Sequence, residues 1–468
     1  MKEHRTRFAA SRLFAALLAL AVLLGAAAWG EPAAVEDVVY VAVDGSDASG
    51  NGTPEAPFAT IGHAAMARPG AVIEVRGGDY GPVSLGPECS GSAASPTVIR
   101  AAEGEAAVVH GEDGAGISIR NACYLTLEGL EVEGGTHGIG CRSTREAGDR
   151  PLEGLVLRDC RVHGIRGVHG ICVYAHNDLA PIAGLVIEGC EVFDCECGSS
   201  ESLVINGNVD GFLIAGNVVH DNNNIGIDMI GFEGTAKRPE SSDGNPFAAD
   251  FVRNGVCRDN VVYNISAEGN PAYLEDGEYD LCADGIYVDG GQDIEICNNF
   301  IFNCDIGLEV ATEHSPEDNE LFRVSGIDVH DNVIAGCLGW TGLCFGGYDG
   351  DRGFTEGCAF HHNTLADNVT QIAVQRSRDN RVYANLLLGG ETAVELSEDC
   401  GPEDLVNDIS GNAAADIEDT DSWTEDYGAV SPDRATVSDG FRSLLEGVGS
   451  RFLPDETWLK TCEAQTAR

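Results

Sequence analysis

The stretch ADGIYVDGGQDIEICNNFIFNCDIGLEV, residues 283–310, decides the fold of this chain. Apolar residues alternate with polar ones in it, and Gly or Asn interrupts the alternation every few residues. The alternation has the period of a β-strand, and each interruption is a turn signal. One such segment is too short to bury its own apolar face, so it must stack on similar segments.

The pattern apolar–x–apolar–x–x–(Asn or Cys)–x–apolar recurs along the chain, with intervals of 22 to 43 residues. Copies include LTLEGLEV at Leu125, LVIEGCEV at Leu185, IEICNNFI at Ile294 and IDVHDNVI at Ile327. The uneven intervals favour coils joined by loops of different length, and no ten-residue amphipathic helix separates the copies. The sequence therefore predicts an all-β fold, a right-handed parallel β-helix solenoid of about ten or more coils.

The sixth position of the repeat is most often asparagine. Asn tolerates the left-handed backbone region and bonds neighbouring backbone groups, so it suits the bend between two strands of a coil. We expect the stacked side chains to form a hydrogen-bonded ladder that serves architecture and binds no ligand. The asparagines are Asn217, Asn260, Asn299, Asn332, Asn363, Asn385 and Asn412.

The two ends of the chain differ from the repeat. Residues 1–30 have the basic, apolar and small-residue order of a signal peptide, which predicts a secreted protein, extracellular or periplasmic. Residues 36–110 are predicted to hold an N-terminal cap and the first coils, with Thr60 capping a short helix over residues 61–68. Residues 111–415 are predicted as the β-helix, and residues 416–468 as an irregular C-terminal cap or tail. No later segment is apolar enough to span a membrane.

Composition narrows the classes of partner. The formal net charge of -48 repels phosphate backbones, so nucleic-acid binding is excluded, and we expect a monomer. The 17 cysteines show no spacing typical of a zinc site. Register places Cys160 beside Cys190 and Cys304 beside Cys337, as disulfides or as stacked buried thiols, and we favour stacked thiols.

Three similar phrases mark a candidate site: NIGIDMIGFEG (residues 224–234), ADGIYVDGGQD (283–293) and DIGLEVATEH (305–314). If these phrases stack, Asp228, Tyr287 and Glu309 form one column on an outer surface, and the alternative to a functional site is a solvated acidic face. Carboxylates there can perform acid/base work, and aromatic rings can stack on sugar rings. The predicted catalytic residues are Asp228, Asp289, Glu309, Glu313 and His314, and the predicted substrate-binding residues are Tyr287, Tyr348, Asp349 and Arg352.

The segments VYVAVDGSDASGNGTPEAPFATIGHAA, ADGIYVDGGQDIEICNN and IGLEVATEH resemble secreted bacterial right-handed β-helix proteins of the pectate-lyase-like superfamily. That superfamily includes polysaccharide lyases, glycoside hydrolases and uronate epimerases. The resemblance therefore implies a carbohydrate-related role with an extracellular polysaccharide as the partner, and it leaves the reaction open.

Three functions compete for this site. A lyase needs a base and a cation, for which Asp284 and Asp289 are the predicted calcium ligands. Its base would be Lys237, Arg253, Arg352 or His314, yet related lyases place a lysine on the helix wall, whereas Lys237 lies in a long loop. A hydrolase needs two carboxyls roughly 5 to 9.5 Å apart and no cation. The third alternative is a non-catalytic glycan-binding or cell-surface structural protein.

Overall fold

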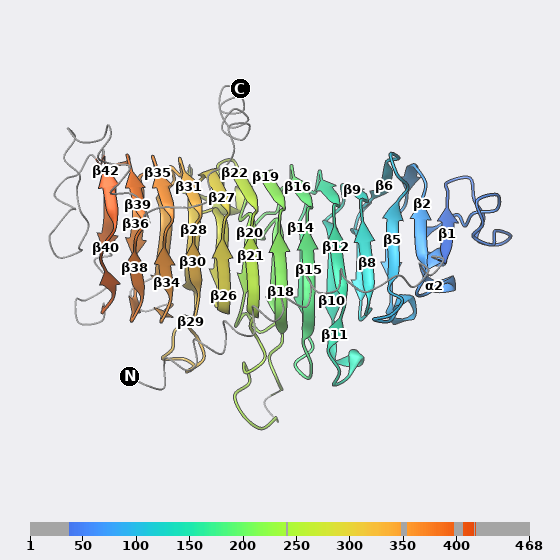
Figure 1. The fold of residues 1–468 in the computed structure, drawn as a ribbon, viewed down its shortest axis with the longest axis horizontal. Helices are drawn as coiled ribbons and strands as arrows, with labels where there is room; N and C mark the ends of the chain where they lie inside the picture. Colours follow the sequence, from blue (N-terminus) through green and yellow to red (C-terminus); the bar gives the residue numbers. More distant parts are fainter. Residues whose placement is uncertain (1–36, 240–241, 348–352, 397–405, 416, 418–468) are drawn as a thin grey trace, which may run out of the picture. The chain divides into compact units, whose positions relative to one another are not determined.

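The structure is a computed structural model that describes residues 37–239, 242–347, 353–396, 406–415 and 417. Three long sheets of parallel strands run side by side through the stack of coils, with β1 at one end and β42 at the other (Figure 1). Each turn of the chain adds one rung to the sheets. The predicted right-handed parallel β-helix is confirmed.

The largest sheet has seventeen strands and collects the first arm of each coil. They are β1 (Val38–Val41), β2 (Val72–Val75), β5 (Thr97–Ala101), β8 (Leu125–Glu128), β11 (Leu152–Glu153), β12 (Leu155–Arg158), β15 (Ile182–Glu188), β18 (Val209–Ala215), β21 (Arg253–Arg258), β26 (Gln292–Cys297), β29 (Val324–Ser325), β30 (Asp328–His330), β33 (Thr355–Glu356), β34 (Ala359–His361), β37 (Ser377–Arg378), β38 (Arg381–Tyr383) and β41 (Asp408–Ile409).

The second sheet has twelve strands. They are β3 (Gly78–Tyr80), β6 (Ala107–His110), β9 (Glu131–Glu133), β13 (Arg161–His163), β16 (Glu191–Phe193), β19 (Val218–Asn222), β22 (Val261–Ile265), β27 (Phe300–Cys304), β31 (Val333–Ala335), β35 (Thr364–Ala366), β39 (Leu386–Leu388) and β42 (Ala413–Ala415).

The third sheet has eleven strands and carries the candidate site. They are β4 (Val83–Leu85), β7 (Ala115–Arg120), β10 (His137–Ser143), β14 (His169–Ala175), β17 (Leu203–Gly207), β20 (Ile227–Ile230), β25 (Asp284–Asp289), β28 (Ile306–Thr312), β32 (Thr341–Gly347), β36 (Thr370–Val374) and β40 (Thr392–Leu396).

Short elements complete the chain. The helix α2 (Ile61–Ala67) packs near β2 and β4 in the first coils, and the Thr60 hydroxyl accepts a hydrogen bond from the His63 N–H at 3.3 Å, so the predicted capping helix is confirmed. Three 3-10 turns, η1 (Pro87–Cys89), η2 (Arg145–Ala147) and η3 (Pro271–Tyr273), lie in loops, and β23 (Leu274–Glu275) and β24 (Glu278–Tyr279) form an antiparallel ribbon. No helix in the described ranges is long and apolar enough to cross a membrane.

The asparagine ladder is present. From Asn260 to Asn412, each side-chain amide oxygen accepts bonds of 2.9–3.0 Å from the backbone and side-chain N–H groups of the preceding asparagine. The expectation that the asparagine itself takes the left-handed conformation is wrong. The residue before it does, as at Asp259 (φ 57°) and Ala384 (φ 55°), which frees the asparagine side chain to point along the stack.

The described cysteines are free thiols, and most are buried. Cys160 hydrogen-bonds to Cys190, and Cys304 to Cys337, in neighbouring coils. In these two pairs the structure therefore contains stacked thiols and not disulfides. The predicted signal peptide and nearly all of the predicted tail lie outside the described residues, and the division at residues 110 and 415 stays a prediction.

Candidate active site

The predicted column exists on the eleven-stranded sheet. In the parallel register Asp228 of β20 lies opposite Tyr287 of β25, and Tyr287 lies opposite Glu309 of β28. The column continues to Cys344 of β32 and begins at Val204 of β17. Neighbouring positions in such a column are about 4.8 Å apart. Asp228 and Glu309 therefore lie on either side of Tyr287, one strand spacing from it and two strand spacings from each other.

A local bend in β25 adds Asp284 to this face. Two consecutive residues, Gly285 and Ile286, face the core, because a Cβ at Gly285 would lie 2.5 Å from Ile301 Cγ2 and 2.8 Å from the Gly307 carbonyl oxygen. Glycine is required where the backbone approaches its neighbours this closely. The doubled inward step shifts the alternation by one residue, so that Asp284 and Tyr287 lie on the same side of the strand.

The column faces away from the core, and its side chains are nevertheless buried from solvent. The relative exposures are 2% for Asp228, 2% for Asp284, 6% for Asp289, 7% for Tyr287 and 9% for Glu309. Burial of this many carboxyls is costly unless they hold protons or meet partners. The site is therefore built to alter the ionisation of its acids.

Asp284 and Glu309 form a carboxyl pair joined by a side-chain hydrogen bond. Burial raises the pKa of Glu309 to about 7. Burial, with the added charge of Glu309, raises the pKa of Asp284 well above its ordinary value. Two such carboxyls cannot both ionise at low cost, so the pair holds a proton at neutral pH.

Asp289 lies diagonally from Glu309 across the β25–β28 pairing. The Thr312 side chain and the Glu313 backbone hydrogen-bond to its carboxyl, while its Oδ1 is buried and accepts no hydrogen bond. Burial and the nearby Glu233 and Glu313 charges raise its pKa, and the two hydrogen bonds oppose that shift. One oxygen is thus fixed in place and the other is open to an incoming donor.

Sequence reasoning missed Glu201, which precedes β17. Burial raises its pKa to about 7, and its charge contributes to the raised pKa of Asp228. The His169 ring nitrogen Nδ1 lies 3.4 Å from its carboxylate, and the Tyr174 hydroxyl meets the other ring nitrogen of His169 at 3.1 Å. No repeat position marked Glu201, because it lies in the loop before β17 (Leu203–Gly207). We call Glu201, Asp228, Asp284, Asp289 and Glu309 the acid cluster.

Buried oxygens without a hydrogen-bond donor concentrate here. A buried acceptor without a donor costs about 1–3 kcal/mol, so these atoms indicate a ligand rich in donors, a cation, or bound water. In the described part of the chain they are Glu201 Oε2, Asn206 Oδ1, Asn224 Oδ1, Asp228 Oδ1, Asp284 Oδ1, Asp289 Oδ1 and Gln375 Oε1.

Oxygen donors of this kind match the ligand chemistry of calcium. Their arrangement is less favourable, because no three members of the acid cluster place one oxygen each within 4.8 Å of one another in the described residues. Calcium binding at Asp284 and Asp289 therefore stays a prediction.

The other predicted site residues are placed differently. Glu313 is exposed just beyond β28, and His314 Nε2 pairs with Glu233 Oε1 at 2.8 Å. That hydrogen bond raises the pKa of His314. Tyr348, Asp349 and Arg352 lie outside the described residues.

The bases proposed for an elimination reaction are not all near the acid cluster. The Lys237 Nζ lies over the Phe247 ring at 4.8 Å, in the loop that follows β20. Arg253 belongs to β21 of the seventeen-stranded sheet, where it pairs with Asp210 at 3.3 Å. Arg352 is among the residues not described, so His314 is the one candidate base that the structure places beside the site.

Comparisons with known proteins give one long match and shorter or more distant ones. No protein-family model matches the chain. The uncharacterised protein YwoF of Bacillus subtilis (strain 168) is 33% identical over 387 residues, which cover 78% of this chain and 77% of YwoF. The pectate lyase PEL9 of Emericella nidulans is 32% identical over 146 residues, which cover 27% of this chain and 35% of that lyase.

Among solved structures, the GH136 lacto-N-biosidase from Eubacterium ramulus superposes with a TM-score of 0.53 at 12% identity. The match covers 79% of this chain and 67% of that one. At this identity the likeness shows a shared β-helix fold and says nothing of the reaction.

Proposed function

The chain belongs to the family of the Bacillus subtilis protein YwoF, within the pectate-lyase-like superfamily, and we propose that it is a secreted glycoside hydrolase that acts on an extracellular polysaccharide. The observation that carries the proposal is the buried, proton-sharing pair of Asp284 and Glu309 diagonally across from Asp289. General acid catalysis on a glycosidic oxygen needs a carboxyl that is still protonated near neutral pH, and burial provides it.

The strand positions of Glu309 and Asp289 favour inversion. Diagonal positions on paired strands are roughly 7–8 Å apart along the backbone, and a carboxyl separation of about 6.5–9.5 Å leaves room for a water molecule. Glu309 donates its proton to the leaving glycosidic oxygen. Asp289 in its ionised form accepts a proton at Oδ1 from the water that attacks the anomeric carbon from the opposite face, and its raised pKa makes it a stronger base than an ordinary aspartate. The side-chain hydrogen bond between Asp284 and Glu309 positions the Glu309 carboxyl and lowers its pKa, against the larger effect of burial.

The acceptor-rich surroundings favour a neutral glycan. Sugar hydroxyls can donate to the buried oxygens of Asp228, Asn206 and Asn224, which otherwise lack donors. A polyanionic glycan would be repelled by the negative charge of the acid cluster unless a cation bound with it and neutralised that charge. No step of the proposed reaction requires a metal ion.

Calcium-assisted β-elimination is the second candidate, favoured by the partial match to a pectate lyase and by the oxygen donors of Asp284 and Asp289. In that case the two aspartates would hold the cation, which supplies charge neutralisation of a uronate carboxylate. His314 would be the base. Its Nε2 is already paired with Glu233, and that pairing raises its pKa, which weakens this candidate.

The test is turnover on a panel of neutral and uronate polysaccharides, with and without a calcium chelator. Hydrolysis predicts new reducing ends without unsaturated uronates, no effect of the chelator, and a loss of about 100-fold or more in Glu309→Gln and Asp289→Asn. The matched control is Glu395→Gln, since Glu395 is exposed on the same sheet and in the same column. Unsaturated products that require calcium would select elimination, and glycan binding without turnover would leave a binding protein.

A further inference from the structure

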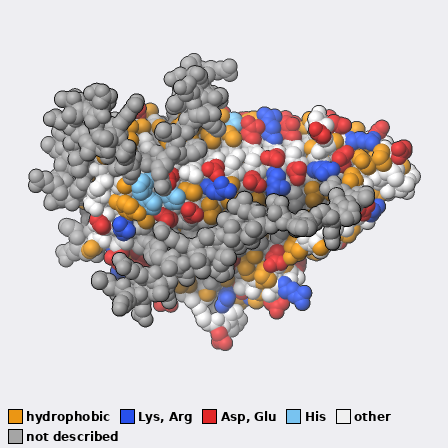
Figure 2. All heavy atoms as spheres, in the orientation of Figure 1, with side chains coloured by type: hydrophobic (Ala, Val, Ile, Leu, Met, Phe, Trp, Pro, Cys, Tyr) orange, Lys and Arg blue, Asp and Glu red, His pale blue; other side chains and the backbone are white. Residues whose placement is uncertain are grey.

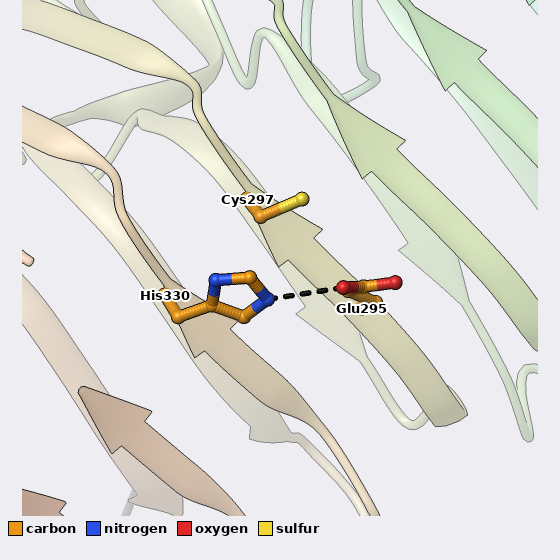
Figure 3. A group of neighbouring side chains, drawn as sticks. All are labelled: Glu295, Cys297 and His330. Carbon is orange, nitrogen blue, oxygen red and sulfur yellow. Dashed lines mark hydrogen bonds and ion pairs between the residues drawn. The ribbon is translucent and has the colours of Figure 1, made fainter. Parts of the chain in front are cut away.

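The seventeen-stranded sheet carries a second group of chemically reactive side chains. Glu295 and Cys297 lie two residues apart on β26, so both point outward, and His330 of β30 lies opposite Cys297 in the parallel register (Figure 3). One ligand atom from each of the three lies within 4.8 Å of the others. The group belongs to a different sheet from the acid cluster, and the proposed hydrolysis does not use it.

We propose that Glu295, Cys297 and His330 form a binding site for a late first-row divalent cation such as Zn²⁺, with water completing a tetrahedral set. Thiolate, imidazole and carboxylate together are a donor set that suits zinc and excludes calcium and magnesium. In a tetrahedral zinc site such ligand atoms are about 3.5 Å apart. Side-chain rotations that move each ligand atom by about 1 Å would therefore bring the three atoms to the spacing of a tetrahedral zinc site.

The environment of His330 matches that of a metal ligand. Its Nδ1 meets the Asp331 carboxylate at 2.9 Å, which is the outer contact that orients ligating histidines and directs Nε2 toward the metal. Its Nε2 lies 3.0 Å from Glu295 Oε1, so a hydrogen bond joins these two atoms in the absence of a metal. A bound cation would take the place of the proton in that hydrogen bond and would contact both atoms. Binding therefore displaces the Nε2 proton and the Cys297 thiol proton into solvent.

Cys297 differs from the cysteines that fill the core. Thiols such as those of Cys190 and Cys304 point inward and lie within hydrogen-bond distance of the carbonyl two residues earlier. Cys297 instead lies on the outer face between Arg258 and His330. The Glu295 side chain is 44% exposed, which gives a cation a path from solvent.

The surrounding charge favours a cation. Figure 2 shows acidic side chains spread over the face drawn there, together with a patch of histidine side chains. At the site itself, Glu295 is joined by Asp331 and Asp259, whose charges act on Cys297, with Arg258 as the opposing charge. The next coil adds His361, stacked on the His330 ring at 5.1 Å and bound to Asp328. The bound ion would link two adjacent coils.

The experiment is titration of the full-length, metal-stripped and reduced protein with Co²⁺, followed by displacement with Zn²⁺. We expect one equivalent of Co²⁺ with a sulfur-to-cobalt charge-transfer band and tetrahedral d–d bands. We expect Cys297→Ser to abolish the charge-transfer band, and His330→Asn to weaken binding at least 10-fold. Zn²⁺ should raise the melting temperature of the wild-type protein and leave that of Cys297→Ser unchanged.

Cys344→Ser is the matched control, because Cys344 is the thiol that lies next to Glu309 in the candidate active site. The Cys344→Ser variant should keep the sulfur-to-cobalt charge-transfer band and the Co²⁺ affinity of the wild-type protein. If the band survives in Cys297→Ser or disappears in Cys344→Ser, the assignment is wrong. Absence of saturable Co²⁺ binding to the wild-type protein would also overturn it. Should Cys297→Ser fail to fold, Glu295→Gln and His330→Asn provide the same comparison through affinity.

Discussion

The substitution Glu309→Gln should make the protein more stable at alkaline pH, although it removes a proposed catalytic residue. A pKa of about 7, against an ordinary value of 4.5, means that the fold disfavours the ionised form by about 3 kcal/mol. Below pH 4.5 the carboxyl is protonated in both states and carries no penalty. Stability is lost as pH rises from 4.5 through 7, and above 7 the full penalty applies. Glutamine does not ionise, so the Glu309→Gln variant does not carry this free-energy penalty.

The assay is urea unfolding at pH 4 and pH 8 at constant ionic strength. Between pH 4 and pH 8, the free energy of unfolding of Glu309→Gln should rise by up to about 3 kcal/mol relative to that of the wild type. Because the comparison is between two pH values, any packing effect that does not depend on pH cancels. The exposed Glu395→Gln should show no such difference. A gain below about 0.5 kcal/mol, or an equal gain in Glu395→Gln, would refute the argument that burial of Glu309 keeps it protonated.

Three further substitutions test the scaffold and the site. Asn363→Ala should cost about 2–5 kcal/mol in chemical denaturation, because it leaves the buried backbone N–H of Asn332 and other ladder groups without partners; a cost under 1 kcal/mol would contradict the ladder's role. Gly285→Ala should cost about 1–3 kcal/mol through overpacking, read as a lower melting temperature, whereas an unchanged value would show that the bend relaxes freely. His314→Gln should keep hydrolytic activity within about 10-fold, since the His314 ring is already paired with Glu233, and a 100-fold loss would make it catalytic.

The repeat pattern was sufficient to predict the coils and the register of the site. The three glycine-containing phrases align because each glycine lies where the chain turns inward, so Asp228, Tyr287 and Glu309 fell into one column. Alternation along a strand has a period of two, and a register is fixed once the core-facing residues are known. The helix cap at Thr60 was equally local and equally predictable.

The chemistry of the site was less accessible to sequence reasoning. Simple alternation places Asp284 toward the core, and the doubled inward step at Gly285 and Ile286 reverses this and brings it to Glu309. Glu201 precedes its strand in a loop that has no repeat signal. The burial of Asp228, Asp289 and Glu309 from solvent could not be predicted either, because the strand period separates only core-facing from outward positions.

The metal group was invisible for a related reason. Zinc motifs are recognised by short fixed spacings, whereas Cys297 and His330 lie in adjacent coils whose separation depends on loop length. The solenoid brings them opposite each other through strand pairing. Candidate ligands in a β-helix are therefore found by register and seldom by sequence spacing.

The stereochemistry of the first product tests the central claim most directly. Once a cleaved glycan is identified, proton NMR during early turnover reports the anomeric configuration of the new reducing end before mutarotation. Asp289 as base and Glu309 as acid, diagonally placed on β25 and β28, predict inversion of configuration. Retention of configuration, or an unsaturated uronate at the new non-reducing end, would contradict the account.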